Sequence, residues 1–312
     1  MQPLIFFFNV IIFVVSIFLL VFYTGTISND FAQYELIFNQ ISNSGRVIDA
    51  VLQYRYEPGF TMLYYYLSVF FSAQNTFLMI ASFILTIKYS FFHRYLKYPI
   101  SAWFFYAILF MPVLDASQLR TAIASTIIIY LLLTPSTTNG YVFKTVFASM
   151  FHYVALISIL FQSYKKPILT VIMTLFIALS LDYGLGFISG DIFKFTAYLS
   201  SSYSMTQSVN YFNLISISQL FLCLYCIINW KHLNDVQKKG GLLIIIGMLL
   251  YFTLGKSPGI AHRIREVSLL GIFPLLFSIK VNFNYKSILA YSSVLFICTY
   301  HFVYIVVELI NL

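Results

Sequence analysis

The side chains in this sequence that could do chemistry are a small number of charged residues beside long apolar runs. Glu57 stands in the stretch Tyr56-Glu57-Pro58-Gly59-Phe60, directly before a proline that suits the first turn of a helix. The helix dipole favours a carboxylate at that position. Glu57 is therefore either a helix cap at a membrane boundary or part of a polar site at the membrane surface, and the placement of the arginines favours the site.

Arg120 lies near the start of the apolar helix that we expect from Leu119 to Leu133. A charge there is costly unless it faces a cavity or a partner. The planar fork of an arginine binds phosphate through two parallel hydrogen bonds and stays charged when desolvated. Arg120 is therefore a candidate anion clamp. The alternatives are that its side chain snorkels to the membrane interface or pairs with Asp115.

The densest cluster of charge in the chain is His262-Arg263-Ile264-Arg265-Glu266. On a helix, His262 and Glu266 share a face because they are four residues apart, and Arg263 is three residues from Glu266. The cluster suits a site that combines anion binding by Arg263 and Arg265 with proton transfer by His262. Structural ion pairing at a membrane boundary is the alternative.

His152 is isolated in the apolar run from Tyr141 to Phe161. A histidine in that setting more often makes a hydrogen bond between helices than acts as a catalytic base, and both roles stay open. Asp30 and Glu35 are not spaced as a DxD motif, and no histidine–carboxylate pair forms a convincing metal cage. We therefore expect neither a metal ion nor a cofactor.

Hydropathy indicates the elements that must position these residues. Apolar residues make up 60% of the 312 and charged residues 9%, which excludes a soluble globular domain. The repeated apolar runs predict an all-α polytopic integral membrane protein of about 9–11 transmembrane helices in a single membrane domain, residues 1–312. Two larger extracytoplasmic loops are expected, at about residues 24–57 and 182–213. The net charge of +8 comes from lysines distributed among loops, so no nucleic-acid partner is expected.

Orientation follows from lysine and arginine in the short loops. The lysine-rich loops all lie inside if the Glu57 segment and the His152 segment are re-entrant, each entering and leaving by the same face. Ten of the twelve lysines, including Lys88, then lie at cytoplasmic edges. Five of the six arginines lie at the outer face, which indicates an anionic ligand there. These five are Arg46, Arg55, Arg120, Arg263 and Arg265.

Five short motifs occur in an order that resembles the EpsG family, the Wzy-type polymerases of bacterial surface polysaccharides. They cover most of the chain from Asp30 to about Lys280. The motifs are Asn29-Asp30-Phe31-Ala32-Gln33-Tyr34, Tyr56-Glu57-Pro58-Gly59-Phe60, Leu119-Arg120-Thr121-Ala122-Ile123-Ala124, Phe151-His152-Tyr153-Val154-Ala155-Leu156 and His262-Arg263-Ile264-Arg265.

The resemblance implies an enzyme of the bacterial inner membrane that joins oligosaccharide repeat units carried on undecaprenyl pyrophosphate at the outer face, without a metal. The product would be an O-antigen, capsule or exopolysaccharide, and the partners would be the bilayer, the lipid-linked oligosaccharide, a chain-length regulator and a flippase. A lipid-linked-sugar glycosyltransferase, an O-antigen ligase and a polysaccharide flippase or transporter stay open as alternatives.

The resemblance also implies roles for individual residues. The residues expected to bind substrate are Asp30, Arg55, Arg120, Arg263 and Arg265. The residues expected to accept the proton of the attacking sugar hydroxyl are Glu57, His152 or His262.

Overall fold

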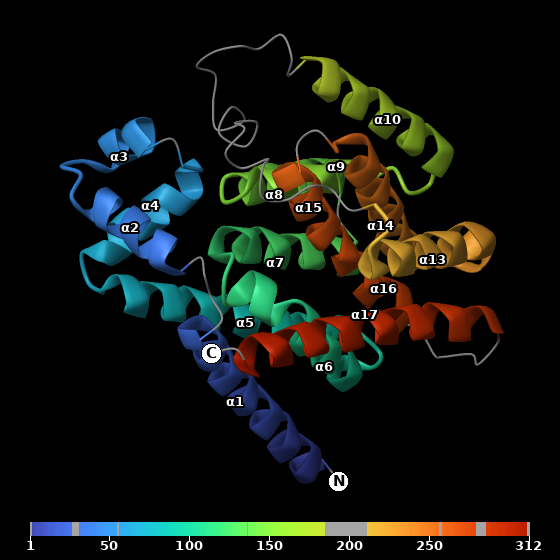
Figure 1. Ribbon diagram of the computed structural model, residues 1–312, viewed down its shortest axis with the longest axis horizontal. Coiled ribbons are helices and arrows are strands. Elements are labelled where there is room, and N and C mark those ends of the chain that lie inside the picture. The colour runs from blue at the N-terminus through green and yellow to red at the C-terminus, as the bar shows by residue number, and fades with distance from the viewer. Residues whose placement is uncertain are drawn as a thin grey trace. The chain divides into compact units, whose positions relative to one another are not determined.

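The computed structural model contains helices and no strands in the part of the chain that it describes, and the protein is an all-α polytopic membrane protein (Figure 1). Three described segments, Ala73–Tyr95, Leu214–His232 and Asp235–Thr253, are long and apolar enough to cross a membrane, and five other described helices are apolar but shorter. The predicted fold class is confirmed. The structure describes residues 2–26, 31–54, 56–135, 137–184, 211–255, 258–278 and 285–310.

In chain order the described elements are α1 (Gln2–Thr26), α2 (Phe31–Ser42), α3 (Val47–Tyr54), α4 (Pro58–Ser68), α5 (Ala73–Tyr95), α6 (Pro99–Leu109), the π-helix η1 (Met111–Asp115), α7 (Leu119–Leu133), α8 (Thr138–Ser149), η2 (Tyr153–Ile157), α9 (Ser158–Phe161), α10 (Pro167–Gly184), α13 (Leu214–Asn229), η3 (Trp230–His232), α14 (Asp235–Thr253), α15 (Pro258–Ser268), η4 (Leu269–Gly271), α16 (Ile272–Phe277) and α17 (Tyr285–Ile310).

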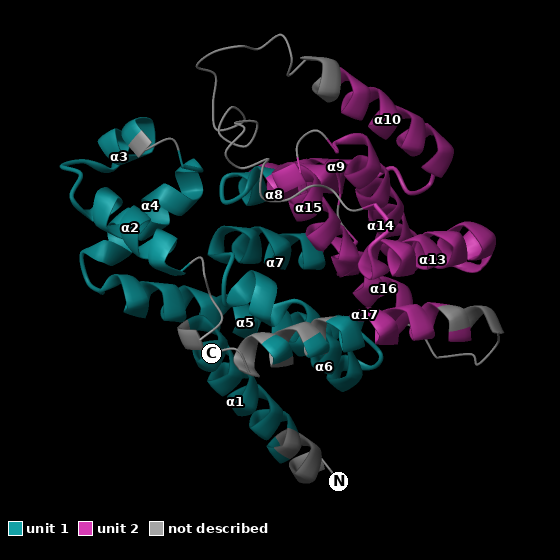
Figure 2. Cartoon of the chain, viewed as in Figure 1, with its two compact units in different colours: residues 1–130, 147–153, 298–312 teal, residues 131–146, 154–297 magenta. Residues whose placement is uncertain are grey.

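The chain divides into two compact units, which Figure 2 shows in separate colours. Unit 1 comprises residues 1–130, 147–153 and 298–312, and unit 2 comprises residues 131–146 and 154–297. The expectation of a single membrane domain over residues 1–312 stays a prediction, as does the number of spans.

In unit 1, the polar stretch expected as an outer loop at about residues 24–57 folds largely into helices α2 and α3. Tyr34, Ile37, Phe38 and Ile41 are buried on α2. Their spacing of three, one and three residues places them on one face of a helix, and α2 packs through it against α4 and α5. The other expected loop, at about residues 182–213, lies almost entirely outside the described residues.

The chain around His152 is a broken helix. Helix α8 ends at Ser149, and the 3₁₀-helix η2 begins at Tyr153, so His152 stands in the break. Irregular backbone of this kind is tolerated at membrane depth where protein or a polar cavity surrounds it. The break fits the predicted re-entrant path, and whether this segment and α4 enter and leave by one membrane face stays a prediction.

In unit 2, α14 is the helix around which the others pack. It contacts α9, α10, α13, α15 and α16. Gly247 on α14 lies so close to Ser268 on α15 that a Cβ atom would collide with the serine side chain, and a Cβ atom on Gly240 would collide with the carbonyl oxygen of Gly271. Close approach through small residues is common in helix pairs within membranes because backbones can then pack directly.

Candidate functional site

The carboxylate of Glu57 is bound by Arg120. Arg120 Nη1 donates to Glu57 Oε2 at 2.8 Å, and the two side chains are 17% and 7% exposed. Glu57 is the N-cap residue of α4, with Pro58 in the first turn as predicted, but its side chain makes no cap hydrogen bond. Glu57 therefore holds the N-cap position without a capping hydrogen bond, and its side chain is directed to Arg120 instead. The alternative pairing of Arg120 with Asp115 is wrong, because Asp115 binds Lys88 and Tyr106.

Aromatic rings surround the Arg120 guanidinium. Its central carbon lies 6.0 Å from the ring centroid of Tyr34 and 5.9 Å from those of Tyr56 and Phe60. The backbone N–H of Arg120 also approaches Tyr34 Oη at 3.4 Å. Rings at this distance attract a cation through their quadrupoles and limit the access of water. The site therefore holds a cation in partly dehydrated surroundings.

His152 lies on the other side of the Glu57 carboxylate. Its Nδ1 is 3.6 Å from Glu57 Oε1, which is longer than a hydrogen bond and within ion-pair distance when the imidazole is protonated. The His152 side chain is 4% exposed. Arg120, Glu57 and His152 thus form a cation–carboxylate–imidazole chain within unit 1.

A backbone contact brings Glu57 and His152 together. The N–H of Gly59 donates to the carbonyl oxygen of Met150 at 2.9 Å, which joins the start of α4 to the break in the helix beside His152. A Cβ atom on Gly59 would lie 3.0 Å from that carbonyl oxygen, so only glycine fits without displacement of the neighbouring chain. The Pro58-Gly59 pair therefore serves both to start the helix and to allow this approach.

Unit 2 contains a buried arginine whose acceptors are all neutral. Arg265 is 8% exposed. Its Nη1 donates to Tyr251 Oη, Ser216 Oγ and Asn213 Oδ1 at 3.2, 3.3 and 3.4 Å. Among the described residues, its Nε has no acceptor and none of its contacts is to a carboxylate. A buried charge without a counter-ion is unfavourable, so this guanidinium is suited to bind an anion.

His262 stays neutral beside these arginines. Burial lowers the pKa of His262 most, and the positive charges of Arg265 and Arg263 lower it further, to about 4. Its ring lies 5.5 Å from that of Tyr251, centroid to centroid. Arg263 pairs with Glu266 at 3.5 Å, as their spacing of three residues predicted. This imidazole binds a proton only weakly until a neighbouring anion offsets the two cations.

The eight candidate residues fall into three groups in the structure. In unit 1, Arg120 and His152 both lie against Glu57. In unit 2, His262, Arg263 and Arg265 are on the one helix α15. Asp30 and Arg55 lie outside the described residues. In the described part of the chain, no group of three histidine, cysteine, aspartate or glutamate side chains could hold a metal ion.

Several partners of the candidate residues come from parts of the chain that the sequence motifs do not include. Tyr34 had a usable signal, because it begins the buried helical face of α2 and belongs to the first motif. The acceptors of Arg265 gave no comparable signal, because they come from α13, its N-cap and α14. Lys88, expected at a cytoplasmic edge, is fully buried. Burial among the helices does not test its depth in the membrane, so that expectation stays a prediction; its carboxylate partner Asp115 is what the sequence did not indicate.

The helical fold and the buried charges define a polytopic membrane protein with polar sites among its helices. The EpsG family model matches residues 6–311, nearly the whole chain, and the protein belongs to the EpsG family, whose members are Wzy-type polysaccharide polymerases. Membership supports a polymerase-type function in general, in the lipid bilayer and on lipid-linked substrates. Comparison with curated proteins and with solved structures gave no significant match.

Proposed function

We propose that the protein joins undecaprenyl-pyrophosphate-linked oligosaccharide repeat units into an O-antigen, capsule or exopolysaccharide at the outer face of the bacterial inner membrane. The observation that carries the proposal is the Arg120–Glu57–His152 chain, a charged and nearly buried site in a member of a polysaccharide polymerase family. Ionisable groups buried among membrane helices are costly and mark functional sites.

The proposed reaction forms one glycosidic bond and breaks one sugar–phosphate bond. A hydroxyl of one lipid-linked unit attacks the anomeric carbon of the growing chain, and undecaprenyl pyrophosphate leaves with the bonding electrons. The hydroxyl proton passes to a base of the protein. The protein therefore has to supply a proton acceptor and to stabilise the negative charge that develops on the pyrophosphate.

His152 is the best proton acceptor of the three candidates. One oxygen of the Glu57 carboxylate is already engaged by Arg120 at 2.8 Å, which leaves Glu57 less available to accept a proton from the substrate. The same carboxylate lies 3.6 Å from His152 Nδ1, where its negative charge offsets the positive charge that the imidazole acquires when it accepts a proton during the reaction. Glu57 then orients His152, and Nε2 takes the proton. His262 is a poorer base because its pKa is about 4.

The arginines bind pyrophosphate in this proposal. Arg265 is the strongest candidate, because burial with only neutral acceptors leaves its charge uncompensated within the described chain. Arg263, two residues earlier on α15, is a second candidate, and it pairs with Glu266 at 3.5 Å. In unit 1, a guanidinium has five N–H donors in a planar fork, so pairing of Arg120 with Glu57 is compatible with binding of a phosphate oxygen.

Analysis of glycans in a deletion strain tests the function. Cells without the protein should carry single repeat units on the lipid carrier or the surface and no ladder of longer chains, and re-expression should restore the ladder. A normal ladder in the deletion strain would refute the polymerase assignment. Absence of repeat units from the outer face would favour a flippase. An incomplete repeat unit would favour a glycosyltransferase, and full-length polymer retained on the lipid carrier would favour a ligase.

A further inference from the structure

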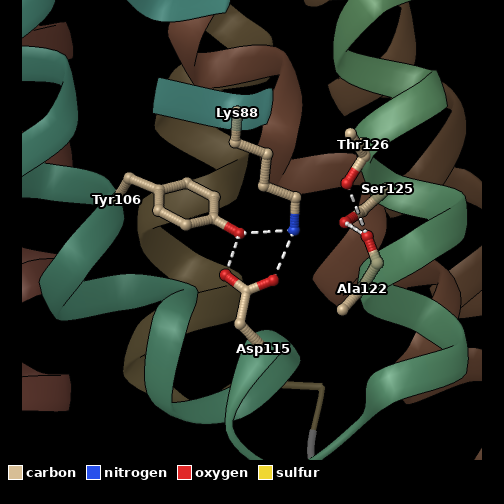
Figure 3. Close-up of polar contacts among 6 residues, drawn as sticks. All are labelled: Lys88, Tyr106, Asp115, Ala122, Ser125 and Thr126. Atoms are coloured by element: carbon tan, nitrogen blue, oxygen red, sulfur yellow. Dashed lines mark hydrogen bonds and ion pairs between the residues drawn. The ribbon is translucent and has the colours of Figure 1, made fainter. Parts of the chain in front are cut away.

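Unit 1 contains a second buried charged group, made of Lys88 on α5, Tyr106 on α6 and Asp115 at the end of η1 (Figure 3). Lys88 Nζ donates to Asp115 Oδ1 at 2.6 Å and to Tyr106 Oη at 2.7 Å. Tyr106 Oη donates to the other carboxylate oxygen, Asp115 Oδ2, at 2.5 Å. All three residues are 0% exposed. They form a closed triangle in which each side chain binds the other two.

Stability alone does not account for this triangle. Lys88 lies within a helix long and apolar enough to span a membrane, where desolvation of an ammonium and a carboxylate offsets much of their attraction. Apolar side chains of similar volume would fill the same space without that desolvation. What the triangle supplies and apolar packing does not is one defined geometry for the three elements that it joins.

The element that the triangle holds most directly is the turn leading to Arg120. The π-helix η1 ends at Asp115, and the N–H of Gln118 then donates to the carbonyl oxygen of Leu114 at 2.8 Å. The carbonyl oxygen of Gln118 in turn accepts from the N–H of Ala122 at 2.9 Å, within α7. Short π-helices are rare in proteins, and those that occur are often found at functional sites. Arg120 is thus five positions after Asp115, and the two backbone hydrogen bonds of Gln118 connect the end of η1 to the first turn of α7.

We propose that Lys88, Tyr106 and Asp115 are positioning residues, which fix the turn after η1 and so direct the Arg120 guanidinium onto Glu57. The inference rests on the proposed function of the Arg120–Glu57–His152 site. It adds three residues that contact neither the substrate nor the reacting atoms. Loss of the triangle shifts Arg120 relative to Glu57, and small misplacements of catalytic groups have large effects on rate.

The test uses the full-length protein in membranes and the double variant Lys88→Met/Asp115→Asn. Removing only one partner leaves a buried charge unpaired and endangers folding, whereas the double variant removes both charges and keeps an acceptor for Tyr106. Its matched control is Ser16→Ala, which removes the 2.8 Å acceptor of Trp103 Nε1, another buried hydrogen bond of unit 1.

Two measurements distinguish positioning from a general structural role. The first is the polymerisation rate per molecule, in wild-type and Arg120→Lys backgrounds. The double variant should lower the rate on the order of 10- to 100-fold in the wild-type background and have little further effect once Arg120 is replaced. The second is the labelling rate of a cysteine introduced at Ser117, within the turn. The double variant should accelerate it, and Ser16→Ala should change neither quantity.

Normal rate and normal labelling in the double variant would overturn the inference, and so would an equal loss of rate in both backgrounds. Full activity of Arg120→Lys would instead refute the role of the Arg120 fork in the proposed site. The labelling rate at position 117 would still test the triangle. If the double variant fails to accumulate, Tyr106→Phe replaces it, because it removes only the hydroxyl that closes the triangle. Wild-type labelling in Tyr106→Phe would then overturn the inference.

Discussion

The variant Arg120→Lys distinguishes two roles of Arg120: binding through the planar fork of N–H donors, and supply of a positive charge alone. The substitution keeps the positive charge near Glu57 but removes the planar fork that donates to Oε2 at 2.8 Å and lies among three aromatic rings. A hydrogen bond to a charged group contributes about 1.5–3 kcal/mol. Since about 1.4 kcal/mol corresponds to a tenfold change in rate, polymerisation should slow roughly 10- to 150-fold.

The assay is the initial rate of oligomer formation from lipid-linked repeat units in isolated membranes, normalised to the abundance of the protein. Arg120→Ala should be slower still, because it leaves the Glu57 carboxylate, 7% exposed, without its cation. Arg94→Lys is the matched control, since Arg94 is exposed and its contact in the described chain is with the Tyr95 ring, not with a predicted site residue. An Arg120→Lys protein that makes normal ladders at normal abundance would refute the role of the fork.

The remaining predictions concern His262 and topology. The folded-state pKa of His262, about 4, lies below the ordinary value of 6.5, so between these pH values the unfolded chain binds a proton that the folded protein does not. Unfolding temperature should therefore fall as pH is lowered from 6.5 toward 4, and an equally steep fall in His262→Gln would contradict this. A cysteine introduced at Ser117 should react with an impermeant thiol reagent added outside the cell, and one introduced at Lys231 should react only from the inside. Reaction of position 117 only after permeabilisation would exclude the re-entrant path. The native cysteines Cys223, Cys226 and Cys298 are buried and should not interfere.

The sequence predicted the helical membrane fold because hydropathy is a local property. A run such as Ile123 to Leu133 carries no charge and is mostly apolar, and no other part of the chain is needed to infer a helix in lipid. The periodicity of apolar residues carried further information in the stretch that forms α2. The buried positions of α2 follow a helical spacing, and that spacing could have predicted a helix within the stretch that we expected to be a loop.

The sequence also indicated which residues could bind a pyrophosphate or accept a proton, because charged residues are few in a mostly apolar chain and their desolvation is costly. Which charge meets which was decided only by the tertiary structure. Arg120 is five residues from Asp115 and 63 from Glu57, yet it pairs with Glu57, and Asp115 pairs with Lys88. Electrostatic pairing depends on distances in space and on burial. Both are set by the packing of α4, α5, α6 and α7 and by the contact between Gly59 and Met150, not by spacing along the chain.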